Sequence, residues 1–123
     1  VGGNVANAIS TSTANSVGYV GIPQNPQSGA TYTLGFGDEG KHIYMTYSSV
    51  ANVVIPANAT TSFPIGTSIA IATANTLTIN IASDTLIFAN SGLTGNRALS
   101  SNGIASLLKV ANTTWFVSGV GIY

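Results

Sequence analysis

The chain contains no cysteine and very few charged residues, and each absence removes a class of function. Without cysteine it can form no disulfide, no thiolate nucleophile and no cysteine-ligated zinc site. Only 5% of its residues are charged, whereas an ordinary globular domain has about 25%. Three acidic and three basic side chains give a formal net charge of +0. Because binding to a phosphate backbone needs clustered lysine and arginine, we predict that nucleic acid is not a partner.

Long apolar runs are also missing. Apolar residues make up 45% of the chain, but Thr, Ser, Asn or Gly interrupts them every few positions. No stretch approaches the roughly 20 apolar residues of a transmembrane helix, and the first residues lack the basic and apolar blocks of a signal peptide. We therefore predict a soluble protein with no membrane partner and a surface of hydroxyl and amide groups. Since a surface without net charge favours association, we expect much of it to face other subunits.

A length of 123 residues predicts one domain with a single core. Residues 1–30 are rich in small and polar side chains and end in a stretch that contains Pro23 and Pro26, which favours an extended path. We interpret residues 1–30 as an arm or linker, and leave open whether it is flexible or docks on a neighbouring subunit. Residues 31–123 then form the folded domain.

Short runs typical of β-strands fill the folded domain. The clearest is residues 76–81, where Leu77, Ile79 and Ile81 alternate with small polar residues, so that one face of the strand is apolar. Turn residues separate the runs at spacings near those of sandwiches and barrels. We predict an all-β fold, an antiparallel β-sandwich of jelly-roll-like or related topology. The other expected strands are residues 32–36, 42–47, 52–55, 67–72, 85–88, 104–110 and 114–118.

Asn102-Gly103 is the strongest hairpin signal in the chain, because both residues tolerate the positive φ angles of a type I′ turn. It predicts that residues 97–101 and 104–110 form an antiparallel pair. Pro56 and Pro64 are expected at strand boundaries, where a missing N–H breaks no ladder hydrogen bond. We find no Lys or Pro guarding the edges of the expected strands, so neighbouring subunits are expected to cover those edges.

Gly35, Gly37 and Gly40 have the spacing G-x-G-x-x-G of a dinucleotide-binding loop. A true loop of this kind opens a helix, whose N-terminus holds the pyrophosphate, but residues 42–47 alternate as a strand. Asp38 and Glu39 would also repel phosphates. We therefore predict no cofactor here, and interpret these two residues with Gly40 as a hairpin turn in which Gly40 is left-handed.

The sequence offers little for catalysis. His42 is the only histidine, whereas a catalytic zinc site has three protein ligands, so we expect a solvated histidine on a strand and no metal. Asp38 and Glu39 are adjacent and Asp84 is distant, which is a poor match to the paired carboxylates of glycosidases. No G-x-S-x-G elbow is present. We predict that the protein is not an enzyme.

The aromatic residues leave one binding alternative open. Tyr44 and Tyr47 lie close together in a predicted strand, and exposed tyrosine rings can stack on sugars. Trp115 is flanked by apolar residues that would lie on both faces of a strand, which favours a place in the core. A saccharide site at the two tyrosines is therefore the one ligand site that the sequence suggests.

Four short motifs in combination resemble a small β-domain of structural proteins of tailed bacteriophages, in particular tail-fibre-like proteins. The resemblance covers about residues 17–123. The motifs are a D-x-G-K turn at residues 38–41, an I-P-A-N…F-P-I-G loop at residues 55–66, a G-N-R segment at residues 95–97, and a K-V…W…S-G strand pair at residues 109–119. The resemblance implies a virion component, repeated or trimeric, with no catalytic chemistry at these motifs. Intersubunit or turn-stabilising contacts are then expected at Asp38, Glu39, Lys41, Asp84 and Arg97.

The resemblance and the composition together lead to one functional prediction with one alternative. The first is a capsid decoration or cement protein on the virion surface, most simply a homotrimer, that contacts the major capsid protein. The alternative is the tip of a tail fibre that binds a host surface saccharide through exposed tyrosines. A glycan depolymerase is disfavoured because acid and base residues are scarce.

Overall fold

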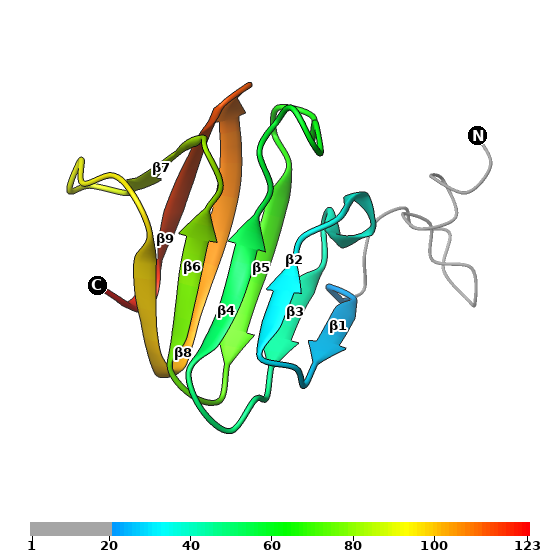
Figure 1. Ribbon diagram of the computed structural model, residues 1–123, viewed down its shortest axis with the longest axis vertical. Coiled ribbons are helices and arrows are strands. Elements are labelled where there is room, and N and C mark those ends of the chain that lie inside the picture. Colours follow the sequence, from blue (N-terminus) through cyan, green and yellow to red (C-terminus); the bar gives the residue numbers. More distant parts are fainter. Residues whose placement is uncertain (1–20) are drawn as a thin grey trace.

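The computed structural model describes residues 21–123 and shows an all-β protein, which confirms the predicted fold class. Its strands belong to one nine-stranded sheet, and a single 3-10 turn, η1 at Phe36–Asp38, interrupts them (Figure 1). In the part of the chain that is described, no helix has the length and apolar character to cross a bilayer.

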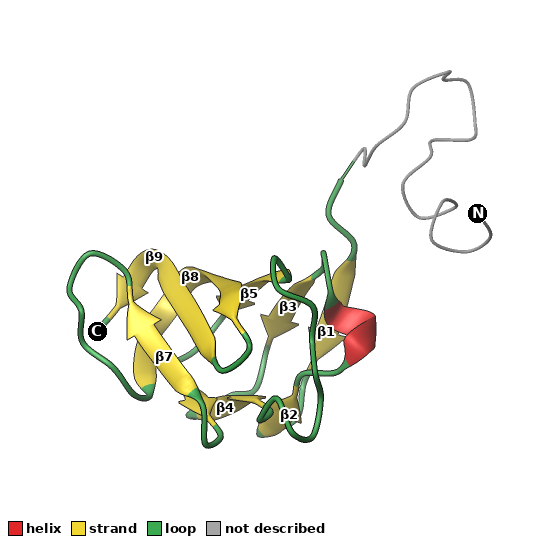
Figure 2. Ribbon diagram, turned by 90° about the horizontal axis from the view of Figure 1, so that it is seen from above, coloured by secondary structure: helices red, strands yellow, loops and turns green. Residues whose placement is uncertain are grey.

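The first six strands form a flattened coil. The chain alternates between two layers, so that β1, β3 and β5 pair in parallel in one layer and β2, β4 and β6 pair in parallel in the other. Viewed from above, the two layers face each other across the core (Figure 2). The strands are β1 (Gln24–Gln27), β2 (Thr31–Thr33), β3 (His42–Met45), β4 (Ala51–Ile55), β5 (Ser68–Thr73) and β6 (Leu77–Ile81).

The core lies between the two layers because every second side chain points inward. Ile43 on β3 is in register with Ile71 on β5, and Val53 on β4 is in register with Ile79 on β6. All four of these side chains are fully buried. The predicted alternation at residues 76–81 therefore marks a real strand, β6, with Leu77 and Ile79 on its buried face.

Strand β8 (Arg97–Ala111) closes both layers. Its first residues pair antiparallel with β6, and residues 104–108 pair antiparallel with β5. The change of layer occurs at Asn102, which has a φ of 62°, and Gly103. A Cβ on Gly103 would lie 2.7 Å from the Ser100 carbonyl oxygen, so the bend requires glycine. The predicted hairpin at Asn102-Gly103 is therefore wrong: the two residues form a corner within one long strand.

The hairpin lies further along the chain. Strand β9 (Thr114–Ile122) returns antiparallel to β8, and β7 (Thr85–Phe88) pairs in parallel with β9. Five of the eight strand pairings are parallel. The expected antiparallel pairing is thus found only around β8, because each earlier strand is followed by one in the opposite layer and not by its own neighbour.

Two smaller expectations also change. Strand β1 pairs with β3, so the folded domain begins before the expected boundary at residue 30, and the rest of the predicted arm, residues 1–20, lies outside the described residues. The turn at Asp38, Glu39 and Gly40 is present, and Gly40 has the expected positive φ, 73°. It is not a hairpin, because it leads from β2 in one layer to β3 in the other.

Strands β1 and β2 end the main path of the described sheet, and β7 ends the branch that passes through β9. The carbonyl oxygens of Pro23 and Gln27 accept hydrogen bonds from the neighbouring segment that contains β3. Because successive residues of a strand point their N–H groups to opposite sides, the nitrogen of Pro26 faces the open edge. The expectation that no proline guards a strand edge is therefore wrong for β1, since Pro26 cannot donate to an added strand.

Candidate interaction surface

The outer side of the β8–β9 hairpin exposes large apolar side chains. Ile104 is 51% exposed, Leu108 is 45% exposed and Val120 is 74% exposed. The chain neighbours of Ile104 and Leu108 are buried, as the two-residue period of a strand requires, whereas Val120 lies between two exposed glycines. We call this outer surface the β8–β9 face and define it by Ser68, Ile104, Ser106, Leu108, Val110, Phe116, Ser118 and Val120.

Side chains on the β8–β9 face form rows across the strands. Leu108 pairs with Phe116, and two residues further along Ser106 pairs with Ser118. The next row pairs Ile104 with Val120. The face therefore has two apolar rows with a row of small hydroxyl side chains between them.

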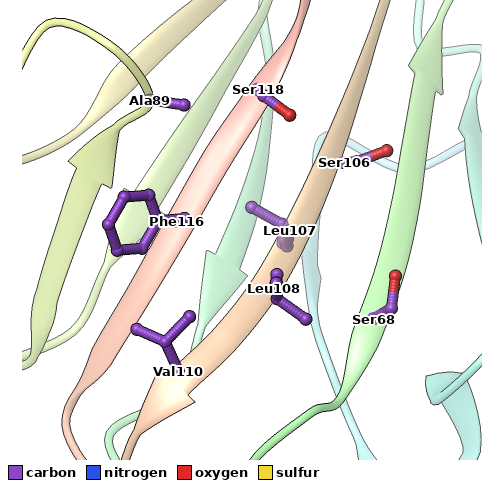
Figure 3. Close-up of a pocket in the computed structure, with 8 residues that line it drawn as sticks. All are labelled: Ser68, Ala89, Ser106, Leu107, Leu108, Val110, Phe116 and Ser118. Atoms are coloured by element: carbon purple, nitrogen blue, oxygen red, sulfur yellow. The ribbon is translucent and has the colours of Figure 1, made fainter.

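A hollow of about 460 Å³ opens on this face. Figure 3 shows its lining residues on β5, β8 and β9 and at the end of β7. Small side chains form much of the wall, and larger apolar ones stand at one end. The lining residues are Ser68, Ala89, Ser106, Leu107, Leu108, Val110, Phe116 and Ser118.

Among the described residues, none that lines this hollow carries a charge. The only charged side chain within residues 104–111 is Lys109, and it points to the core, where it is 1% exposed. Its Nζ donates hydrogen bonds to Asn58 Oδ1 at 2.6 Å and to the Phe63 carbonyl oxygen at 2.7 Å. The Nζ also lies 5.9 Å from the centroid of the Trp115 ring. Lys109 therefore ties the loop between β4 and β5 to the core.

Asp84 belongs to the same cluster. Its Oδ2 accepts a hydrogen bond from the Asn58 backbone N–H at 2.8 Å, so Asn58 links Asp84 to Lys109. Trp115 is 1% exposed, and its ring packs edge-on against Phe63 at 5.6 Å. The core position predicted for Trp115 is confirmed. Lys109 was not predicted as a buried contact, although its alternation with Ala105 and Leu107 places it on the inner face of the strand.

Asp38 is buried, with an exposure of 3%. Its carboxylate accepts hydrogen bonds from Asn25 Nδ2 at 2.8 Å, Tyr32 Oη at 2.7 Å and the Gly35 N–H at 2.9 Å. Burial, and then the hydrogen bond to Asp38, raise the pKa of Tyr32 above its usual value of 10.0. The carboxylate thus joins β1, β2 and η1 within one chain.

Three of the five predicted contact residues lie outside the hydrogen-bonded groups around Lys109 and Asp38. Glu39 is exposed, and its Oε1 accepts a hydrogen bond from Thr67 Oγ1 at 3.2 Å. Arg97 lies with its Cζ 5.9 Å from the centroid of the Phe88 ring. Lys41 is half-buried and contributes its backbone groups to the turn before β3. None of these side chains belongs to the β8–β9 face.

The two tyrosines of the predicted saccharide site do not form one platform. Tyr44 points outward from β3 and is 36% exposed, next to Pro26 on β1. Tyr47 follows the strand and packs partly buried against the core. Of these two tyrosines, only Tyr44 therefore presents an exposed ring.

His42 lies on a strand, as predicted, and its ring is held by its neighbours. Nδ1 lies 3.1 Å from the Ile22 carbonyl oxygen, and Nε2 lies 3.1 Å from Gln24 Nε2. Within residues 21–123, no three side chains of the types that ligate metals come together. Of the G-x-G-x-x-G glycines, Gly35 precedes the short turn η1 and Gly40 precedes β3, so neither opens an α-helix.

No protein-family model matches the chain, and none of the curated proteins compared with it does so either.

Proposed function

We propose that this protein is a non-enzymatic structural component that acts by packing against other subunits. The observation that carries this proposal is the β8–β9 face, which exposes Ile104, Leu108 and Val120 and carries no charged side chain. Contiguous apolar surfaces of this kind mark interaction sites on soluble proteins. Single exposed apolar residues would not indicate an interaction site. Ile104, Leu108 and Val120, however, belong to rows of side chains across neighbouring strands.

The placement of the charged residues supports the same proposal. Asp38 and Lys109 are buried, and each satisfies its charge through neutral donors or acceptors of its own chain. Asp84 holds the backbone of Asn58. The hydrogen bonds of these charged groups stabilise loops between strands, so we assign the three side chains a structural role.

The biological context that we propose is the surface of a bacteriophage virion. With the resemblance to tail-fibre-like β-domains, the scarcity of charge favours a capsid decoration or cement protein, a homotrimer that covers the major capsid protein. Labelling intact particles with an antibody against the domain tests this directly. Label over the whole head is the expected result, and particles that carry no label would contradict a virion role.

A tail-fibre tip that binds a host saccharide is the second candidate. The observation that favours it is the exposed ring of Tyr44 beside Pro26, with Gln24 and His42 in the neighbouring row of the sheet. Label confined to the tail would support this location. A saccharide-binding signal on a glycan array that is lost in Tyr44→Ala, and retained in Tyr123→Ala, would support the binding role, because Tyr123 is also exposed but lies at the end of the chain.

A further inference from the structure

We propose that another copy of this chain covers the β8–β9 face. The inference deepens the proposed function, on which it rests for the view that the protein acts by subunit packing. It names the surface and the partner: Leu108, Phe116 and Val120 of one subunit pack on a second subunit of the same sequence.

Charge favours an identical partner. The described chain has no charged side chain on this face, so two copies can meet without burying an unpaired charge. A strongly charged partner would lose hydration at its own ionic groups and find no compensating charge. The β8–β9 face of a second copy is equally free of charge, so it is a chemically suitable partner.

The relief of the face allows self-complementary packing. The Leu108–Phe116 row and the Ile104–Val120 row stand on either side of the Ser106–Ser118 row. Rows two residues apart along a strand are separated by about 7 Å. A copy shifted by one row therefore places an apolar row opposite the small serine side chains and the hollow beside them. Most soluble oligomers consist of identical subunits that use such matched surfaces.

The area of the face fits a weak contact. Strands β5, β8, β9 and β7 are successive neighbours in the sheet. Ser68–Thr73, residues 104–111, Thr114–Ile122 and Thr85–Phe88 together contain 27 residues. With strands about 4.8 Å apart and a rise of about 3.4 Å per residue, these residues cover about 440 Å². Two copies would bury roughly 900 Å² in total, which is the size of a weak interface, so we expect self-association at high protein concentration.

The end of the coil formed by β1 and β2 is less suited than the β8–β9 face to binding another subunit. Asn25, Tyr32 and Asp38 fill the first turn of the coil with a hydrogen-bonded polar network. Polar terminal repeats close the stacks of repeat proteins, and Pro26 removes a donor from the edge of β1. Lateral packing through the β8–β9 face is therefore favoured over end-to-end stacking.

Sedimentation equilibrium of the full chain tests the inference. The expected mass is that of two or three 12.4 kDa chains. Leu108→Lys places a charge on the face and should weaken self-association at least tenfold, giving the mass of one chain. Leu93→Lys is the matched control, because Leu93 is 56% exposed but lies in the loop after β7, and it should leave the mass unchanged.

Val120→Lys provides a second test in case Leu108→Lys does not fold, since Val120 is 74% exposed and near the end of the hairpin. A monomeric natural chain at high concentration would overturn the inference, as would an oligomer that both folded lysine variants leave intact. The proposed function fails separately. A chain that self-associates through this face but is absent from virions rejects only the virion role, and a monomer that labels virions rejects only the interface.

Discussion

The burial of Lys109 is difficult to predict from the sequence. The residue type indicates the surface, but its position in β8 is in phase with the buried Ala105 and Leu107. The alternation is visible in the sequence. The acceptors are not, because Asn58 and the Phe63 carbonyl group come from a loop 51 and 46 residues away.

Replacing Lys109 should strongly destabilise the fold. Lys109→Met keeps much of the apolar stem but removes the donors to Asn58 Oδ1 and the Phe63 carbonyl oxygen. Leaving buried acceptors unpaired should lower the free energy of unfolding by about 2 kcal/mol, measured by urea denaturation. Lys41→Met is the control and should change it by less than about 0.5 kcal/mol, since Lys41 makes no side-chain hydrogen bond within residues 21–123. Equal stability of the two variants would contradict the role given to Lys109.

Tyr32 should make the stability fall in alkaline solution. Burial and the hydrogen bond to Asp38 raise its pKa in the folded state above 10.0. The folded protein therefore holds this proton more tightly than the unfolded chain, and its contribution is present below the unfolded pKa and lost as the pH rises through the folded pKa. The free energy of unfolding, measured across this range, should decline less steeply in Tyr32→Phe, which lacks the titrating group. Parallel declines in the two proteins would exclude Tyr32 as the cause.

At the scale of the element, the positions of the strands could be predicted from the sequence more reliably than the pairing between them. The alternation of Leu77, Ile79 and Ile81 fixes which face of β6 is apolar. It carries no information on which strand lies alongside, because parallel neighbours such as β3 and β5 are joined through a whole turn of the coil. The Asn102-Gly103 signal failed for the same reason. Its positive φ is local, but whether it produces a hairpin or a corner depends on two distant strands, β5 and β6.

The β8–β9 hairpin should be sensitive to substitution at Gly119. This residue has a φ of 151°, and a Cβ built on it would clash with backbone atoms of Ile104 and Ala105, most severely with the Ile104 carbonyl oxygen. Gly119→Ala should therefore force the strands apart and lower the free energy of unfolding by about 2 kcal/mol or more.

Gly37→Ala is the control for this steric effect, because, apart from its chain neighbours, no described residue has a heavy atom within 4 Å of a Cβ at Gly37. Its midpoint in thermal denaturation should stay close to that of the unmodified chain. A Gly119→Ala protein with the same midpoint would show that the hairpin can adjust its spacing.

For the whole molecule, the chain length and the short alternating runs between turn residues were sufficient to predict an all-β fold with one core. Few charges, many β-branched residues and frequent turn residues leave little room for helices. The candidate site was harder to predict. Exposure of Leu108 and Val120 depends on what covers the outer side of β8 and β9, and alternation cannot tell a face that packs on another layer from one that remains exposed.

Pro26 should protect the molecule from edge-to-edge association. Pro26→Thr restores a backbone N–H at the open edge of β1, so that another strand can pair there. In a Leu108→Lys background, light scattering of a concentrated solution should rise several-fold faster with this substitution. Pro64→Thr, in the loop before β5, should have no such effect. Unchanged scattering in Pro26→Thr would mean that other features close this edge.

Strand β8 also has a consequence for synthesis of the chain on the ribosome. The polypeptide emerges from its N-terminus, so β5 and β6 are complete before Arg97–Ala111, their common partner, becomes available. During that interval the nascent coil holds two unpaired backbone edges at its C-terminal end. Translation that stops before residue 97 would release a product with both edges exposed, and such a fragment should be insoluble even though most of its core residues are present.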